Sequence, residues 1–321
     1  MNRLTTLGAA ALAITAANCL TSAARGQAAP GPFAAESDLP FHAPRFDRIR
    51  DGDYQPAMER GMADQLAEIR RIAADPAPPT FDNTIVAMER SGRMLDRVQH
   101  VFSAVVQANT DPVLDKVQAQ EAPRLAQHED AIYLDPRLFA RVHAVWAGRD
   151  ALTGPEQRQL AEVIHQRFIR AGAQLSDPDK ATLRALNTQL STLETTFQQK
   201  LLAAGKAGAL VVGDEADLAG LDAGAVAAAA QAGKDRGLDG RYVLPLQNTT
   251  QQPPLGSMAN RATREALFER GWTRAERGDA NDTRATIARI AQLRARKAAL
   301  LGFPSWADYV LADQMARTPA A

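Results

Sequence analysis

The chain has 321 residues, with 37 Lys and Arg against 37 Asp and Glu, and 45% of its residues are hydrophobic but only 5% aromatic. This length indicates one large or two modest domains. The zero formal net charge argues against capture of nucleic acid, which needs clustered basic side chains. The single Cys excludes an intramolecular disulfide framework and a Cys-rich zinc module. Because 64 residues are Ala, the composition favours helices over sheets.

The first 28 residues are expected to form a secretory signal peptide. Arg3 precedes a short apolar run from Leu7 to Ala17, and Gly26-Gln27-Ala28 is a plausible cleavage site. The alternative of a membrane anchor is disfavoured, because the run is shorter than the ~18 to 20 residues that span a bilayer. Lipidation of Cys19 is disfavoured by the residues before it. The sequence therefore predicts a periplasmic or secreted protein that has no membrane contact after signal removal.

An extended, proline-punctuated segment is expected over residues 29–50 and a helical region over residues 51–208. A stripe of apolar residues at helical spacing predicts the first helix, which Asp75-Pro76 should end. This stripe is formed by Met58, Met62, Leu66, Ile69 and Ile72. A second stripe, from Ile85 to Val105, predicts one helix capped by Asn83. Pro123 should kink or break the third helix, and a fourth and a fifth follow from Pro136 and Pro155.

The strongest helical signal begins at Ser176, which forms a capping-box pattern with Asp179. Apolar residues then recur every three or four positions, and Gly205 is the expected stop. This stripe comprises Leu183, Leu186, Leu190, Leu193, Phe197 and Leu201. It is typical of helix-bundle packing, with a coiled-coil seam as the alternative, and it lasts less than three heptads.

A small β element with an Ala-rich helix is predicted over residues 209–253. Residues 209–212 and 241–248 have strand character, and Pro245 places the second strand at an edge or a bulge. The helix between them covers residues 223–232. A further helical region over residues 254–321 should contain helices at 256–270, 281–301 and 305–315. The predicted fold class is mostly α, a multi-helix array with a small inserted β element.

No catalytic, cofactor-binding or metal-binding residue is predicted from spacing. The five histidines, at positions 42, 100, 128, 143 and 165, are too far apart for one helix to present two of them one turn apart. The nearest approach to a helical zinc motif is His128-Glu129, where Ile132 stands in place of the second His. We therefore expect His128 to lie on a helix surface or between helices.

The other polar residues have structural interpretations. His100 and His143 are expected to be hydrogen-bonded packing residues, and Glu129-Asp130 is expected to lie on a solvated helix face. Residues 248–254 are rich in amide and hydroxyl groups, which fits a capped turn or a loop lining a peptide cleft beside an edge strand.

Several sequence blocks resemble one enzyme family. These blocks are LPFHAPRFD at 39–47, DYQPA at 53–57, PTFDNTI at 79–85, YVLPLQNTTQQP at 242–253 and KAALLGF at 297–303. They are similar, in the same order, to the peptidyl-dipeptidases, or dipeptidyl carboxypeptidases, of the thimet oligopeptidase family of zinc metallopeptidases. The similarity extends from about residue 37 to residue 321 and corresponds to the N-terminal half of that family.

The resemblance implies a mostly helical lobe of a two-lobed, channel-type enzyme that removes dipeptides from the C-termini of short peptides. The family holds zinc with the two His of a His-Glu-x-x-His helix and a Glu from a following helix, and none of these residues maps onto this sequence. We expect this chain to stop before that catalytic half, to bind no zinc and to be inactive alone. The face that would pack against the other lobe should be apolar and exposed in this chain, and it should allow self-association. The alternative is a non-catalytic, secreted helical module that binds peptides or a protein.

Overall fold

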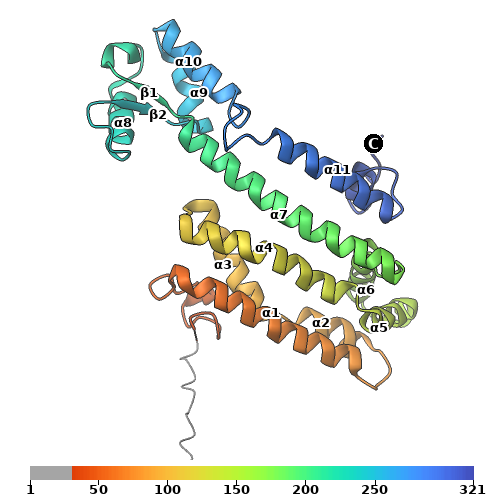
Figure 1. Ribbon diagram of the computed structural model, residues 1–321. Coiled ribbons are helices and arrows are strands. Elements are labelled where there is room, and N and C mark those ends of the chain that lie inside the picture. Colours follow the sequence, from red (N-terminus) through yellow and green to blue (C-terminus); the bar gives the residue numbers. More distant parts are fainter. Residues whose placement is uncertain (1–30) are drawn as a thin grey trace, which may run out of the picture.

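A computed structural model describes residues 31–321, except for the side chains of residues 248–250, and the expected signal peptide at 1–28 lies outside this part. Within it the chain is an array of helices with one two-stranded sheet, which confirms the mostly α fold class. The long helix α7 (Asp177–Ala207) crosses the molecule diagonally, with α4 along one side, α11 along the other and the sheet near one end (Figure 1). The other helices are α1 (Asp51–Ala74), α2 (Ala87–Glu89), α3 (Arg93–Ala108), α4 (Pro112–Tyr133), α5 (Pro136–Ala147), α6 (Pro155–Arg170), α8 (Ala223–Lys234), α9 (Asn248–Ser257), α10 (Arg261–Trp272), α11 (Arg284–Leu300) and α12 (Trp306–Leu311).

The segment before α1 is irregular apart from a short 3-10 helix at Pro40–His42. It is fixed to the fold by Phe33, which is buried and whose ring lies 5.5 Å from the ring of Tyr54 in α1. The helix α1 buries Met58 and Ile69, as their spacing predicts, and it ends before Asp75. This segment and α1 therefore share one apolar cluster with α3 and the start of α4.

The prediction of one continuous helix from Asn83 is wrong. The chain begins there with a π-helical turn, Phe81–Val86, capped by Thr80, whose Oγ1 accepts a hydrogen bond from the Asn83 amide at 3.1 Å. Helix α2 follows, and Gly92 then interrupts the run with φ of 76°, a left-handed conformation that favours Gly. A Cβ atom at this position would also clash with the side-chain amide of Gln65. The predicted stripe of apolar residues therefore extends over two separate helices, α2 and α3.

Pro123 does not break its helix, so that half of the prediction is wrong, while the alternative of a kink stays a prediction. Helix α4 runs from Pro112 to Tyr133 with Pro123 inside it. Asp111 caps its N-terminus by accepting hydrogen bonds from the amides of Val113 and Leu114. Contacts with α1 on one side and α7 on the other hold the helix together where proline removes one backbone donor.

Helix α7 shows bundle packing on two faces. Leu186 and Leu190 pack against Ile290 and Leu293 of α11, while another face of α7 contacts α4. Ser176 caps the helix, accepting a hydrogen bond from the Asp179 amide at 3.3 Å. The helix continues past the predicted stop at Gly205 and ends at Ala207.

The sheet is an antiparallel pair of β1 (Leu210–Val212) and β2 (Tyr242–Leu244), with Leu210 opposite Leu244. The second strand ends before Pro245, so its predicted continuation to residue 248 is wrong. The predicted turn or loop over residues 248–254 is also wrong, since these residues form most of α9. The predicted Ala-rich helix is present as α8, and it packs on β2.

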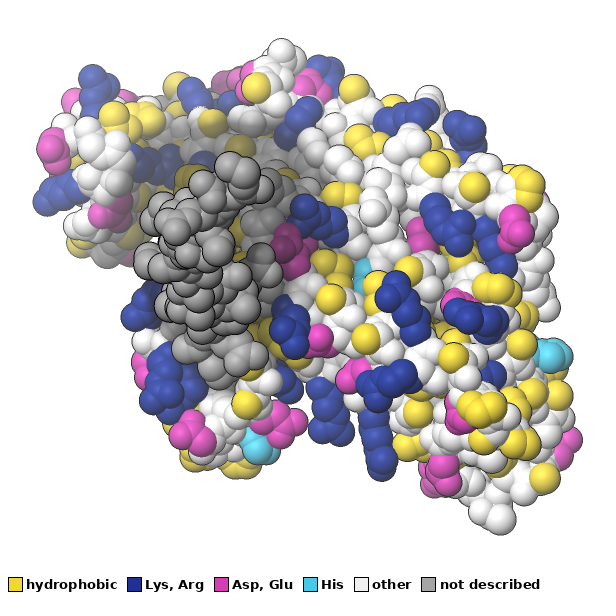
Figure 2. Space-filling model, turned by 60° about the horizontal axis from the view of Figure 1, so that its bottom comes forward, with side chains coloured by type: hydrophobic (Ala, Val, Ile, Leu, Met, Phe, Trp, Pro, Cys, Tyr) yellow, Lys and Arg dark blue, Asp and Glu magenta, His cyan; other side chains and the backbone are white. Residues whose placement is uncertain are grey.

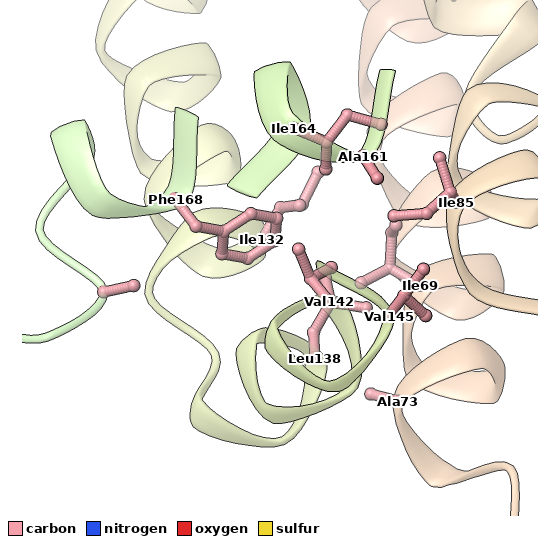
Figure 3. Packing of buried hydrophobic residues seen from close by; sticks show 11 residues of the cluster. Ile69, Ala73, Ile85, Ile132, Leu138, Val142, Val145, Ala161, Ile164 and Phe168 are labelled. Carbon is pink, nitrogen blue, oxygen red and sulfur yellow. The ribbon is translucent and has the colours of Figure 1, made fainter. Parts of the chain in front are cut away.

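A second apolar cluster lies where α1, α4, α5 and α6 meet (Figure 3). Phe168 of α6 is fully buried there beside Ile132 of α4. Its ring makes an edge contact with Tyr133, with centroids 5.0 Å apart, and stacks on Phe139. None of the helices in the described residues is long and apolar enough to span a bilayer.

Candidate functional site

A groove with a cavity volume of about 630 Å³ lies between α3, α4 and α7. Its apolar lining residues include Phe102, Val106 and Leu125. Its walls carry neutral hydrogen-bonding groups, from Gln99, Ser103, Gln107, Gln118, Gln198 and Gln199. We call this the amide-lined groove. Side-chain amides both donate and accept hydrogen bonds, so this surface can pair with a peptide backbone. The charged residues in its lining are Asp115 and Glu121.

Two further cavities, of about 570 and 340 Å³, lie along the same face of α7. The larger one shares Gln99, Leu125 and Gln198 with the amide-lined groove, so the two cavities adjoin each other. The two further cavities meet at a set of polar residues that line both of them, which we call the charged junction. It consists of Glu129, Asp130, Asn187 and Lys297.

The charged junction joins three helices. The Asn187 side-chain amide of α7 donates a hydrogen bond of 2.6 Å to Asp130 Oδ1 of α4. Lys297 of α11 is half-buried, and its ammonium lies 6.0 Å from the centre of the Tyr309 ring. In the part of the chain that the structure describes, neither Asp130 nor Lys297 forms an ion pair within 4.0 Å. Burial raises the pKa of Asp130 and lowers the pKa of Lys297, because each charged form is poorly solvated.

A second buried carboxylate, that of Glu121, lines the amide-lined groove. It is 1% exposed and accepts a hydrogen bond of 3.0 Å from Arg124. Burial raises its pKa despite the cation beside it. Arg124 also pairs with Glu59 of α1, so this carboxylate belongs to a link between α1 and α4.

The prediction that Glu129-Asp130 lies on a solvated face is confirmed for Glu129 and wrong for Asp130. Glu129 is exposed, but Asp130 is only 6% exposed and faces α7. Sequence reasoning did not single out Asn187 or Lys297 as site residues, because they lie more than fifty residues from Asp130 and from each other along the chain. In the sequence, Lys297 stands out only as the start of the KAALLGF block.

The histidines occupy separate positions, apart from His143 and His165. His128 is buried between helices, as predicted, and donates from Nε2 to Gln65 Oε1 of α1 at 2.6 Å. Burial lowers its pKa, which favours the neutral ring. Ile132, one turn later, belongs to the apolar cluster of Figure 3. This segment is therefore part of the structural core.

The remaining histidines are His42, His100, His143 and His165. His42 and His100 are exposed and lie close to carbonyl groups of their own segments, at 2.9 and 2.7 Å. His143 Nδ1 lies 3.1 Å from Nε2 of the buried His165, which stacks on Trp146. His143 is exposed but contacts the rings of Phe139 and Trp146, in line with its predicted packing role. The packing role predicted for His100 is wrong, since its exposed ring is hydrogen-bonded, among the described residues, only within its own helix.

Zinc does not fit the described side chains. Within residues 31–321, no group of three or more His, Cys, Asp or Glu has an arrangement that suits a metal ion. His143 and His165 bring together two ring nitrogens without a third ligand of these types in position. A structural or catalytic zinc site needs at least three protein ligands, so these residues do not form one.

Comparisons with known proteins give consistent matches. Residues 255–321 match the family described as Peptidase family M3. Dipeptidyl carboxypeptidase of Escherichia coli (strain K12) is 51% identical over 291 residues, which cover 90% of this chain and 43% of that protein. Dipeptidyl carboxypeptidase of Salmonella typhimurium is 48% identical with the same coverage of both chains. Oligopeptidase A of Escherichia coli is 26% identical, over 87% of this chain and 42% of that protein. The chain thus spans less than half the length of these curated relatives.

Proposed function

Because this chain is related to the dipeptidyl carboxypeptidases of peptidase family M3, we propose that it is the N-terminal portion of a zinc metallopeptidase that releases C-terminal dipeptides from short peptides. The observation that supports this proposal most directly is the 51% identity to the Escherichia coli dipeptidyl carboxypeptidase over 90% of this chain. The described residues provide no three-ligand zinc group, so this chain alone is proposed to bind no zinc and to be inactive. Residues outside the matched region would hold the metal.

The role proposed for this chain is to hold the peptide. The amide-lined groove offers neutral donors and acceptors beside apolar lining residues, which suits a peptide backbone with varied side chains. Gln199 is held in place because its side-chain amide donates to the Asp115 carbonyl at 2.7 Å. No bond-breaking step is assigned to residues of this chain.

The cellular setting belongs to the same proposal. The expected signal peptide at 1–28 implies a periplasmic or secreted enzyme with no membrane contact after cleavage. Acidic and basic side chains are interspersed on the face shown in Figure 2, which supports a partner other than nucleic acid.

Phe268 and Trp272 stack on each other at the exposed surface of α10, with ring centroids 5.7 Å apart, and they are the proposed apolar contact for self-association.

A graft tests the proposed function. Residues 31–321 replace the matched segment of the Escherichia coli dipeptidyl carboxypeptidase, and release of dipeptide from an N-blocked tripeptide is measured with and without a zinc chelator. We expect chelator-sensitive release by the graft and none by this chain alone, with the unmodified Escherichia coli enzyme as the positive control. A graft that folds and retains zinc but releases no dipeptide would contradict the proposal. Zinc-dependent turnover by this chain alone would contradict the inactive assignment.

A further inference from the structure

The charged junction contains two buried acceptors without a hydrogen-bond donor. Asp130 Oδ2 and Asn187 Oδ1 have no hydrogen-bond partner in the described part of the chain. The orientation of the Asn187 amide is fixed, because its nitrogen donates to the other oxygen of Asp130. The two free oxygens therefore belong to one hydrogen-bonded pair. Leaving buried acceptors unpaired is unfavourable, so the junction is suited to a ligand that donates.

The charges around the junction favour a cationic donor. Two other charged groups on the cavity walls are in ion pairs: Arg170 pairs with Asp313 at 3.2 Å, and Glu194 pairs with Arg294 at 2.7 Å. Arg167 lies beside the neutral Tyr133 hydroxyl group and forms no ion pair within 4.0 Å in the described residues. The junction itself holds two carboxylates, from Glu129 and Asp130, against the single ammonium of Lys297. Asp130 itself has no ion-pair partner within 4.0 Å in the described part of the chain, so an ammonium at its free oxygen would give it one.

We propose that the charged junction binds the free α-amino group of a short peptide whose backbone follows the amide-lined groove. This proposal rests on the proposed function and adds where the amino end of the peptide lies. The ammonium donates to Asp130 Oδ2 and Asn187 Oδ1. Both oxygens are shielded from bulk solvent, so binding requires a rotamer change in a lining side chain.

The geometry of α7 sets the length of such a peptide. Asn187 at the junction and Gln199 in the amide-lined groove are twelve residues apart on this helix. At ~1.5 Å per residue the separation along the axis is ~18 Å, which about five residues of extended chain cover at ~3.3 Å each. A peptide of about five residues therefore reaches from the junction to the far end of the groove.

Peptide binding to the whole chain tests the proposal. Trp306 lines the larger of the two cavities at the junction, so its fluorescence reports binding. The probes are an alanine-rich pentapeptide with a free amino end, the same peptide N-acetylated, and an N-acetylated peptide with Lys at its first position. We expect acetylation to weaken binding about tenfold or more, since a hydrogen bond to a buried charged group is lost. The Lys peptide should not recover this loss, which separates an α-amino group from a side-chain ammonium.

Two variants and a control complete the test. Asp130→Asn and Asn187→Ser should each bind the free and acetylated peptides about equally, while Asp239→Asn, an exposed carboxylate near α8, should behave as wild type. Circular dichroism confirms that each variant is folded. Equal binding of both peptides by the wild-type chain, or a full recovery by the Lys peptide, would overturn the proposal. Dipeptide release by the graft is a separate readout, so this failure would leave the proposed function standing.

Discussion

Replacing Phe168 with Ala should destabilise the contact between α6 and the helices around it. Phe168 is 0% exposed and lies among Ile132, Ile164 and Leu138 in the cluster of Figure 3. Truncating a buried Phe to Ala costs about 3 to 5 kcal/mol, because transfer energy is lost and a cavity remains. The edge contact with Tyr133 adds to the loss, so we expect a value near the upper end, about 4 to 5 kcal/mol.

Urea unfolding followed by circular dichroism measures this loss of stability. Phe168→Leu keeps most of the volume and should cost only about 1 to 1.5 kcal/mol. Phe46→Ala is the matched surface control, since Phe46 is 57% exposed, and it should change the free energy of unfolding by less than about 0.5 kcal/mol. A cost below about 1 kcal/mol for Phe168→Ala, with an unchanged dependence on urea, would refute the assignment of this cluster as a core.

Three other substitutions test particular interactions. Burial raises the pKa of Asp130, so ionising it costs the wild-type fold more free energy as pH rises from the unfolded pKa of Asp through the folded one. Asp130→Asn removes this cost, so the variant should gain stability relative to wild type between about pH 4 and pH 8. A difference in stability that does not change across that range would argue against burial of the charge. Arg141→Met should cost about 3 kcal/mol in thermal or urea unfolding, because Arg141 donates to the Asp75 and Ala77 carbonyls and to Asn83, and a neutral result would mean that these acceptors find other donors. Ser176→Ala should cost about 1 kcal/mol by loss of the α7 cap, whereas Ser176→Asp should keep most of the stability.

Helices with regular apolar stripes were predictable, whereas their interruptions depended on tertiary contacts. The stripes of α1 and α7 give their buried faces directly, since spacing alone determines which side chains share a helix face. The break at Gly92 depends on the close approach of Gln65, and the continuity through Pro123 depends on packing by α1 and α7. Neither neighbour can be inferred from local propensity.

The candidate site was less predictable than the fold. Glu129-Asp130 looks in sequence like any exposed acidic pair, and only the position of α7 shows that one carboxylate is buried. Asn187 lies within a leucine stripe that gives no reason to single it out. The amide-lined groove has the same origin, because its glutamines come from three helices and meet only after folding.

The apolar contacts of α7 determine the geometry of the charged junction. Leu190 lies about one turn after Asn187 on α7, and Leu293 lies about one turn before Lys297 on α11. Both leucines are buried in the same small cluster, so they fix the two helices next to the polar pair. Packed apolar layers have little freedom to shift, so the backbones of α7 and α11 are held at a fixed separation here. The cluster therefore sets how far apart Asn187 and Lys297 stand where they line the same two cavities.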